Sequence, residues 1–278
     1  MIPGIDVSHW QGQVNWERAK AAGVAFVFLK LTEGIAAFDQ RFIENYDGAE
    51  AMGILRGAYH FFRPAENPLQ QANQFIDKWS RYPCELPPVL DLEDRKYISA
   101  ARARSDALLW LNAVEVITGR VPIIYTAPAY ANEVISGEAA FARYPLWIAN
   151  YGVQTPQVPK PWKAYTFWQH TDRGDGPAHG TQSKSVDLDW FNGDEAALLK
   201  LCDLAPSQPT PQPEPNPAPA PSRVRVTAAS LNARSEPRVA ADTARMLATR
   251  GQVYDVERVQ GDWVQAKVWL HKDYVEQV

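Results

Sequence analysis

A run of prolines near the C-terminus constrains the architecture of this 278-residue chain more than any other feature. Residues 204–222 read LAPSQPTPQPEPNPAPAPS and contain eight prolines, almost one at every second position. Proline fixes φ and has no N–H group, so such a segment cannot build a packed core and is typical of an extended spacer. The sequence therefore predicts a domain of residues 1–203, a proline-rich linker of 204–222 and a small domain of 223–278.

The first domain alternates between strand-like and helix-like segments. Short runs rich in β-branched and aromatic residues predict eight strands, at 2–7, 25–30, 54–61, 88–92, 121–125, 146–150, 164–169 and 186–190. Helical periodicity fills the early gaps, at 16–22, 39–52, 68–81 and 99–118, whereas the later gaps are short and rich in Gly and Pro. This order predicts an α/β fold, a modified (β/α) barrel with reduced helices in its second half.

Acidic side chains lie at the C-terminal ends of the predicted strands, where such a barrel carries its chemistry. The segment PPVLDLEDR places Asp91 and Glu93 two residues apart, so both side chains point to the same face of a strand. Carboxylates side by side repel each other, which raises one pKa and keeps an acid protonated near neutral pH. Glycoside hydrolysis usually needs such an acid beside a second stabilising group.

The other strand ends add further candidates to the same predicted barrel mouth. The acids are Asp6 and Asp187, with Asp189 as a rival to Asp187, because the alternation puts both on one face. The candidate substrate-binding residues are Lys30, Glu33, Tyr59, Tyr125, Trp147, Tyr151, Trp168 and Gln169. A barrel mouth lined with acidic and aromatic side chains suits a sugar polymer. Two alternatives stay open: the aromatic residues belong to the core, or Lys30 and Glu33 form a structural ion pair that does not contact substrate.

At these residues the chain resembles glycoside hydrolase family 25, the muramidases often called Chalaropsis-type lysozymes. The matching segments are GIDVSHWQG, FLKLTEG, RGAYHFFRP, PPVLDLED, IIYT, LWIANY, FWQHT and VDLDWF, in the family's order. The resemblance implies the modified barrel as fold and hydrolysis of the β-1,4 bond between N-acetylmuramic acid and N-acetylglucosamine in bacterial peptidoglycan. By motif, Glu93 resembles the general acid, Asp91 its partner, and Asp6 and Asp187 the other two active-site acids.

The last domain, 223–278, shows short alternating strands separated by turn residues. Its segments LNARSEP, RGQVYDVERVQGDWVQAKV and WLHKDYV resemble a bacterial SH3-type domain. The resemblance implies a small all-β, SH3-like barrel that holds the enzyme on the cell wall.

Charge and hydropathy limit the kinds of binding partner that the chain can have. The net charge of the chain is −4. Residues 223–278 contain nine basic and seven acidic residues, and this small excess of positive charge is too weak to indicate a nucleic-acid-binding domain. No apolar run approaches the roughly 18 residues of a membrane span. We expect a monomer that needs no cofactor and no metal, inserts into no membrane and has peptidoglycan as its partner. Cys84 and Cys202 are either two buried thiols or a disulfide.

The N-terminal segment MIPGIDVSHW lacks the basic and apolar regions of a secretory signal peptide. We therefore expect action at the bacterial cell wall after release by another route, as for a phage endolysin, or as a mature secreted form. Two other classes of function stay open, a wall-binding barrel without catalysis and a chitin-cleaving enzyme.

Overall fold

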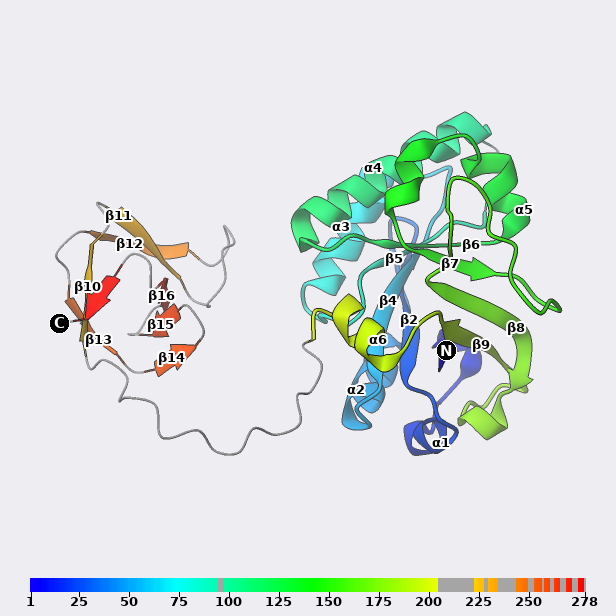
Figure 1. Ribbon diagram of the computed structural model, residues 1–278, viewed down its shortest axis with the longest axis horizontal. Helices are drawn as coiled ribbons and strands as arrows, with labels where there is room; N and C mark the ends of the chain where they lie inside the picture. Colours follow the sequence, from blue (N-terminus) through cyan, green and yellow to red (C-terminus); the bar gives the residue numbers. More distant parts are fainter. Residues whose placement is uncertain are drawn as a thin grey trace. The chain divides into compact units, whose positions relative to one another are not determined.

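The chain forms two compact units, Met1–Ser207 and Gln208–Val278, in the computed structural model (Figure 1). The structure describes residues 1–94, 98–204, 223–227, 230–234, 244–249, 253–256, 258–260, 263–265, 269–271 and 275–277. The linker predicted at 204–222 lies outside the described residues from residue 205 onward.

A closed barrel of eight strands forms the centre of the first unit. Its strands are β1 (Ile2–Val7), β2 (Phe26–Glu33), β4 (Leu55–Phe61), β5 (Val89–Asp91), β6 (Ile123–Thr126), β7 (Leu146–Ala149), β8 (Phe167–Asp175) and β9 (Ser185–Phe191). Neighbours pair in parallel from β1 to β8, and the antiparallel β9 closes the ring between β8 and β1. A two-residue strand, β3 (Ala37–Phe38), pairs with the end of β2 outside the ring.

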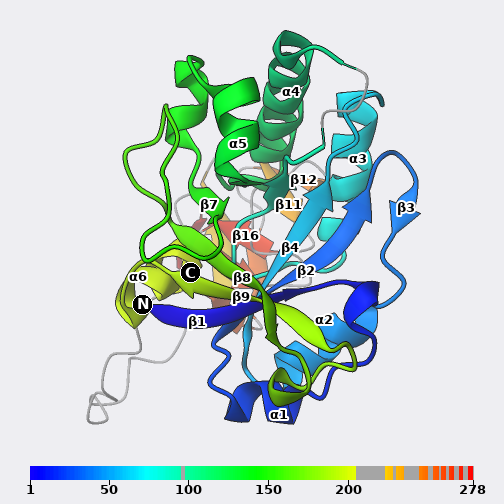
Figure 2. The same ribbon diagram turned by 90° about the vertical axis from the view of Figure 1, so that its right-hand side faces the viewer.

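Helices follow the early strands and become sparse after β7, which confirms the predicted modified barrel. The α-helices between β1 and β6 are α1 (Trp16–Ala21), α2 (Phe42–Ala51), α3 (Pro68–Trp79) and α4 (Ala100–Thr118). Figure 2 shows α3 and α4 side by side on one flank of the barrel, where they pack against each other. In the fully described stretch from β7 to β9, only the single turn η4 (Pro177–His179) is helical.

Local sequence signals explain where the two longest of these helices begin and end. Asn67 caps α3 by accepting hydrogen bonds from the backbone N–H groups of residues 69 and 70, and Pro68 occupies the first position, where its missing N–H costs nothing. Ser99 caps α4 through the N–H of Arg102, and Gly119 ends it at a φ of 70°, a conformation that favours glycine.

Several short helical segments were not predicted from the sequence. The expectation of short, helix-free gaps was wrong after β6, where α5 (Pro128–Tyr130), η2 (Ala131–Ile135) and η3 (Ala139–Arg143) precede β7. Segments of three to five residues are too short to show a helical period, which is why the pattern missed them. The final helix, α6 (Glu195–Leu201), did carry a signal, because Asp194 caps it through the N–H of Ala197.

Two apolar layers hold the barrel together, and β2 illustrates how the sequence divides between them. Phe26 and Phe28 belong to an inner cluster with Val89 and Phe167, whereas Val27 and Leu29 belong to an outer cluster that includes residues of α3 and α4. The strand is therefore buried on both faces and apolar almost throughout, as expected for a parallel strand covered by helices. Cys84 and Cys202 are buried free thiols, as in the first of the two sequence-based alternatives.

The second unit is all β in its described residues. Its strands are β10 (Arg223–Val226), β11 (Ser230–Arg234), β12 (Ala244–Thr249), β13 (Val253–Asp255), β14 (Arg258–Gln260), β15 (Trp263–Gln265), β16 (Trp269–His271) and β17 (Val275–Gln277). They form one sheet in the order β13-β10-β17 and another in the order β12-β11-β16-β15-β14. The SH3-like identity of this unit stays a prediction. Across the described residues of both units, no helix is long and apolar enough to cross a membrane.

Candidate active site

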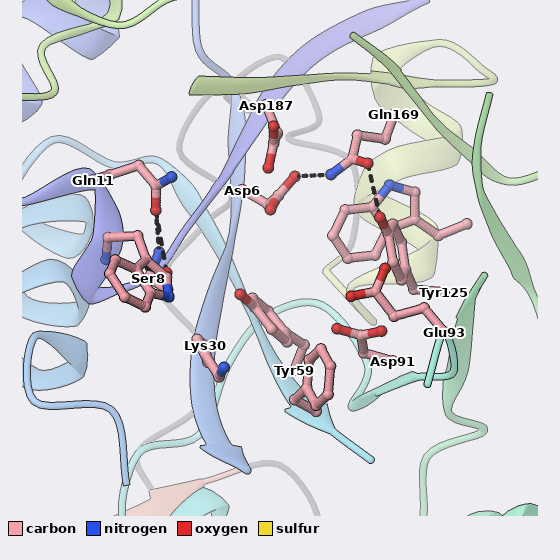
Figure 3. Close-up of a pocket in the computed structure, with 13 residues that line it drawn as sticks. Asp6, Ser8, Gln11, Lys30, Tyr59, Asp91, Glu93, Tyr125, Gln169 and Asp187 are labelled. Carbon is pink, nitrogen blue, oxygen red and sulfur yellow. Dashed lines mark hydrogen bonds between the residues drawn. The ribbon is translucent and has the colours of Figure 1, made fainter. Parts of the chain in front are cut away.

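A pocket of about 250 Å³ opens at the end of the barrel where the parallel strands terminate (Figure 3). The sequence-predicted residues that line it are Asp6, Lys30, Tyr59, Asp91, Glu93, Tyr125, Trp147, Gln169 and Asp187. All four candidate acids thus share one cavity, although they come from three different strands and the segment that follows β5.

Asp91 and Glu93 lie next to each other on one side of the pocket (Figure 3). Asp91 ends β5 and is buried, and its Oδ1 atom has no hydrogen-bond partner among the described residues. Burial, together with the neighbouring Glu93 carboxyl, raises the pKa of Asp91 well above its usual range. Glu93 is exposed toward the cavity, yet the surrounding protein excludes enough water to raise its pKa as well. The pair therefore retains a proton at a pH where free carboxyl groups have lost theirs.

Asp6 and Asp187 face each other on the opposite side of the pocket (Figure 3). They are directly paired residues of the antiparallel strands β1 and β9. Burial and the charges of Asp187 and Asp189 raise the pKa of Asp6, while burial and the charge of Asp172 raise the pKa of Asp187 to about 6. Asp187 lies near the start of β9 because that strand runs against the others, so the simple reading of VDLDWF as another parallel strand end was wrong about direction.

Asp189, the rival candidate, lies beneath the pocket rather than in it. Its side chain is buried, and its Oδ1 accepts a hydrogen bond from Trp147 Nε1 at 2.8 Å. Trp147 in turn stacks on Phe28 with ring centroids 4.3 Å apart and forms part of the pocket wall. The structure thus places Asp187, and not Asp189, on the cavity.

A hydrogen-bond network centred on Gln169 fixes the wall between the two groups of acids. The hydroxyl groups of Tyr125 and Tyr151 both donate to Gln169 Oε1, at 2.8 and 2.5 Å. Since the amide oxygen is occupied by these donors, the amide nitrogen points the other way and donates to Asp6 Oδ2 at 2.6 Å. The network orients Asp6 and holds the tyrosine rings at the cavity edge.

Three predicted substrate-binding residues do not line the pocket. Trp168 packs in the outer apolar layer and donates its indole N–H to the backbone oxygen of Asn150 at 2.8 Å. Tyr151 is partly exposed and reaches the cavity only through its hydroxyl contact with Gln169. Glu33 pairs with Lys30 and with Arg63 and lines a neighbouring hollow instead.

The pocket also contains residues that the sequence analysis did not select. They are Ser8, Trp10, Gln11 and Phe61. Ser8 and Gln11 cap the single turn η1 (His9–Gln11) reciprocally, which fixes the segment directly after β1. Trp10 is 76% exposed at the pocket rim, a position that suits stacking on a sugar ring. Ser8, Trp10 and Gln11 come just after Asp6 in the strand-end segment GIDVSHWQG, and Phe61 ends β4 in the segment RGAYHFFRP; these positions were the available signal.

This arrangement can carry out acid-catalysed cleavage of a glycosidic bond. It presents one carboxyl pair that holds a proton, a second pair across the cavity and an exposed indole at the rim. Lys30 is the cationic side chain among the residues that line the pocket, and its charge lowers the pKa values of both Asp91 and Glu93. It thereby limits how far burial and mutual repulsion can raise them.

Comparisons with known proteins agree with this geometry. The family described as glycosyl hydrolases family 25 matches residues 5–179. Lysozyme M1 of Streptomyces globisporus is 39% identical over 213 residues, which cover 73% of this chain and 71% of that protein. The N,O-diacetylmuramidase of a Chalaropsis species is 35% identical over 186 residues, covering 62% of this chain and 88% of that protein. The crystal structure of the bacterial lysozyme from Streptomyces coelicolor superposes with a TM-score of 0.66 at 37% identity, covering 73% of this chain and 97% of that one.

Proposed function

The chain belongs to glycosyl hydrolases family 25 and is a glycoside hydrolase, and from this premise we propose that its barrel is a peptidoglycan muramidase. It hydrolyses the β-1,4 bond between N-acetylmuramic acid and N-acetylglucosamine and so lyses bacterial cell walls. The observation that carries the proposal is the Asp91–Glu93 pair, whose raised pKa values keep a proton available at one side of a pocket lined by acids and aromatic residues.

We assign the general-acid role to Glu93, because it is the member of the pair that faces the open cavity and can reach a bound linkage. It protonates the leaving oxygen, which lowers the cost of breaking the bond. Asp91 lies beneath, with one carboxyl oxygen that has no partner among the described residues. That oxygen is suited to bind and orient the substrate's N-acetyl group.

Asp6 and Asp187 complete the site from the far side of the cavity. Their paired carboxyl groups and the Gln169 amide provide acceptors and donors for sugar hydroxyl groups and stabilise positive charge that develops at the anomeric carbon. Tyr59, Tyr125 and Trp147 provide aromatic wall, and Lys30 provides a donor beside the acid pair.

The all-β second unit is proposed to be an SH3-like module that binds the cell wall, with the linker as tether. Its binding to insoluble wall would raise the local concentration of the barrel without changing the chemistry. The enzyme is proposed to act at the wall as a monomer, released as phage endolysins are or present as a mature secreted form.

Digestion of two insoluble glycans tests the proposed substrate. Purified peptidoglycan and chitin are incubated with the full-length protein, and the release of soluble reducing sugar is followed. A muramidase releases sugar from peptidoglycan and leaves chitin intact. Release from chitin alone would identify a chitin-cleaving enzyme, and release from neither, combined with sedimentation on walls, would identify a binding protein without catalysis.

A further inference from the structure

A second hollow, of about 170 Å³, adjoins the candidate active site. Its walls come from His9 just after β1, Lys30 and Glu33 of β2, and Ala37 and Phe38 of β3. Lys30 lines both this hollow and the pocket that holds the four acids, so the two spaces share a wall. A substrate bound at the acids can therefore extend a side branch into the hollow.

His9 is held in a fixed orientation within the hollow. Its Nδ1 lies 2.6 Å from Asp39 Oδ2, and its backbone N–H donates to the same oxygen at 3.1 Å. Asp39 is buried, and its other oxygen accepts the backbone N–H of Arg41 at 2.9 Å. With Nδ1 directed at the carboxylate, Nε2 is the ring nitrogen that can meet a ligand.

The carboxylates of the hollow already have partners, whereas Lys30 and His9 keep hydrogen-bonding capacity. Glu33 accepts from Lys30 Nζ at 2.6 Å and from Arg63, and these contacts lower its pKa. Lys30 Nζ has three donor hydrogens, of which the contact with Glu33 uses one. Lys30 Nζ and His9 Nε2 are thus the groups most able to bind an incoming acceptor.

This chemistry fits a charged branch better than another sugar ring. While the lactyl group of each muramic acid is in amide linkage to a stem, the glycan chain of peptidoglycan is uncharged, whereas the stem peptides carry carboxylates and amides. We propose that the hollow is a subsite for the peptide stem of peptidoglycan, with Lys30 and His9 binding a stem carboxylate. This inference rests on the proposed muramidase function and extends it to the part of the substrate that lies beside the glycan chain.

A steric block of the hollow tests the subsite. Ala37 is exposed and lines the hollow, so Ala37→Trp fills the space without touching the four acids. The neighbouring Ala36 is also exposed but is not among the lining residues, so Ala36→Trp is the matched control. A second variant, His9→Gln, keeps an amide donor for Asp39 and removes the imidazole nitrogen.

Each protein is assayed on two soluble substrates, glycan chains that carry tetrapeptide stems and the same chains stripped of stems by an amidase and then amidated chemically at the lactyl carboxylates that the amidase exposes. On stem-bearing chains, Ala37→Trp should raise KM at least about tenfold, because it prevents a hydrogen bond to a charged group of the stem. His9→Gln should also raise KM on these chains. On stripped chains both variants, like Ala36→Trp on either substrate, should stay within about twofold of the unchanged protein.

The possible results distinguish a failure of the subsite proposal from a failure of the muramidase proposal. If Ala37→Trp matches the unchanged protein on both substrates, or loses equally on both, the hollow does not bind stems while the muramidase assignment stands. If the unchanged protein cuts neither kind of chain, the muramidase assignment fails and the subsite fails with it. Thermal melts of the variants identify any loss that comes from unfolding, which would act on both substrates alike.

Discussion

Replacing Glu93 by glutamine exchanges the carboxyl group for an amide of nearly the same size and shape. A glutamine amide cannot give up a proton to a leaving oxygen, and a positioned acid contributes roughly 10²–10⁴-fold to a rate. That range corresponds to about 2.7–5.5 kcal/mol of transition-state stabilisation, since each tenfold change costs about 1.36 kcal/mol. We therefore expect Glu93→Gln to release reducing sugar from purified peptidoglycan at least about a hundredfold more slowly than the unchanged protein, which is the lower limit of that range.

The same change should leave the fold intact, and its effect on stability should depend on pH. The Glu93 carboxylate helps to raise the pKa of Asp91, and a carboxyl whose pKa is raised in the folded state opposes folding once the unfolded chain ionises. This penalty is absent below the ordinary carboxyl pKa, about 3.9, and grows as pH rises above it. Glu93→Gln should therefore melt at an equal or higher temperature than the unchanged protein at pH 7, and the difference should shrink at pH 4.

Turbidity clearance and reducing-sugar release are measured together with melts at both pH values. Asp94→Asn is the matched control, because it removes an adjacent carboxyl that pairs with Arg63 at 2.8 Å and does not line the pocket. It should keep most of the activity. If Glu93→Gln retains more than about a tenth of the rate, Glu93 is not the general acid.

Three further outcomes follow from the same geometry. Because Asp91 and Glu93 approach from one side of the pocket, we expect net retention with the substrate's N-acetyl group as nucleophile; NMR of the first product should show the β-anomer, and an initial α-anomer contradicts this. Burial and the charge of Asp172 raise the pKa of Asp187 to about 6, so a penalty on folding grows between the ordinary carboxyl pKa of about 3.9 and pH 6 and is fully present above pH 6. Asp187→Asn should thus gain stability at pH 7, by no more than about 3 kcal/mol, and gain none at pH 4; equal gains at both pH values in denaturant titrations would argue against a raised pKa. A chain ended at Asp203 should fold and cleave soluble glycan fragments at nearly the full rate but lyse whole walls more slowly; equal lysis of whole walls refutes the anchoring role.

The sequence predicted the barrel because its strands carry a simple signal. β2, β5, β6 and β7 are mostly apolar runs buried on both faces, and their order with the early helices leaves few alternative folds. The antiparallel direction of β9 was not predictable from composition. It follows from the short turn after β8, since a parallel crossover needs a dozen or more residues, and only Asp175 to Ser185 separates the two strands.

The acids of the site were predictable from the segments around the strand ends, and Tyr59, Tyr125 and Trp147 also line the pocket as predicted, whereas Trp168 does not. Trp168 and Gln169 are neighbours on β8, so they point to opposite faces and could not both line one cavity. Strict alternation from Phe167, which belongs to the inner cluster, would have placed Trp168 outside and Gln169 inside. Strand alternation does not apply to Trp10, which lies on a single turn beyond β1, so its place just after Asp6 was the signal for it.

The identity of the newly formed reducing end shows which of the two glycosidic bonds of peptidoglycan the enzyme cuts. Purified peptidoglycan is digested with the full-length protein, reduced with borohydride and hydrolysed, and the resulting amino-sugar alcohol is identified by chromatography. A muramidase leaves N-acetylmuramic acid at each new reducing end, so we expect the muramic acid alcohol to accumulate with time. Accumulation of the glucosamine alcohol instead would mean that the other glycosidic bond is cut and that the barrel is not a muramidase.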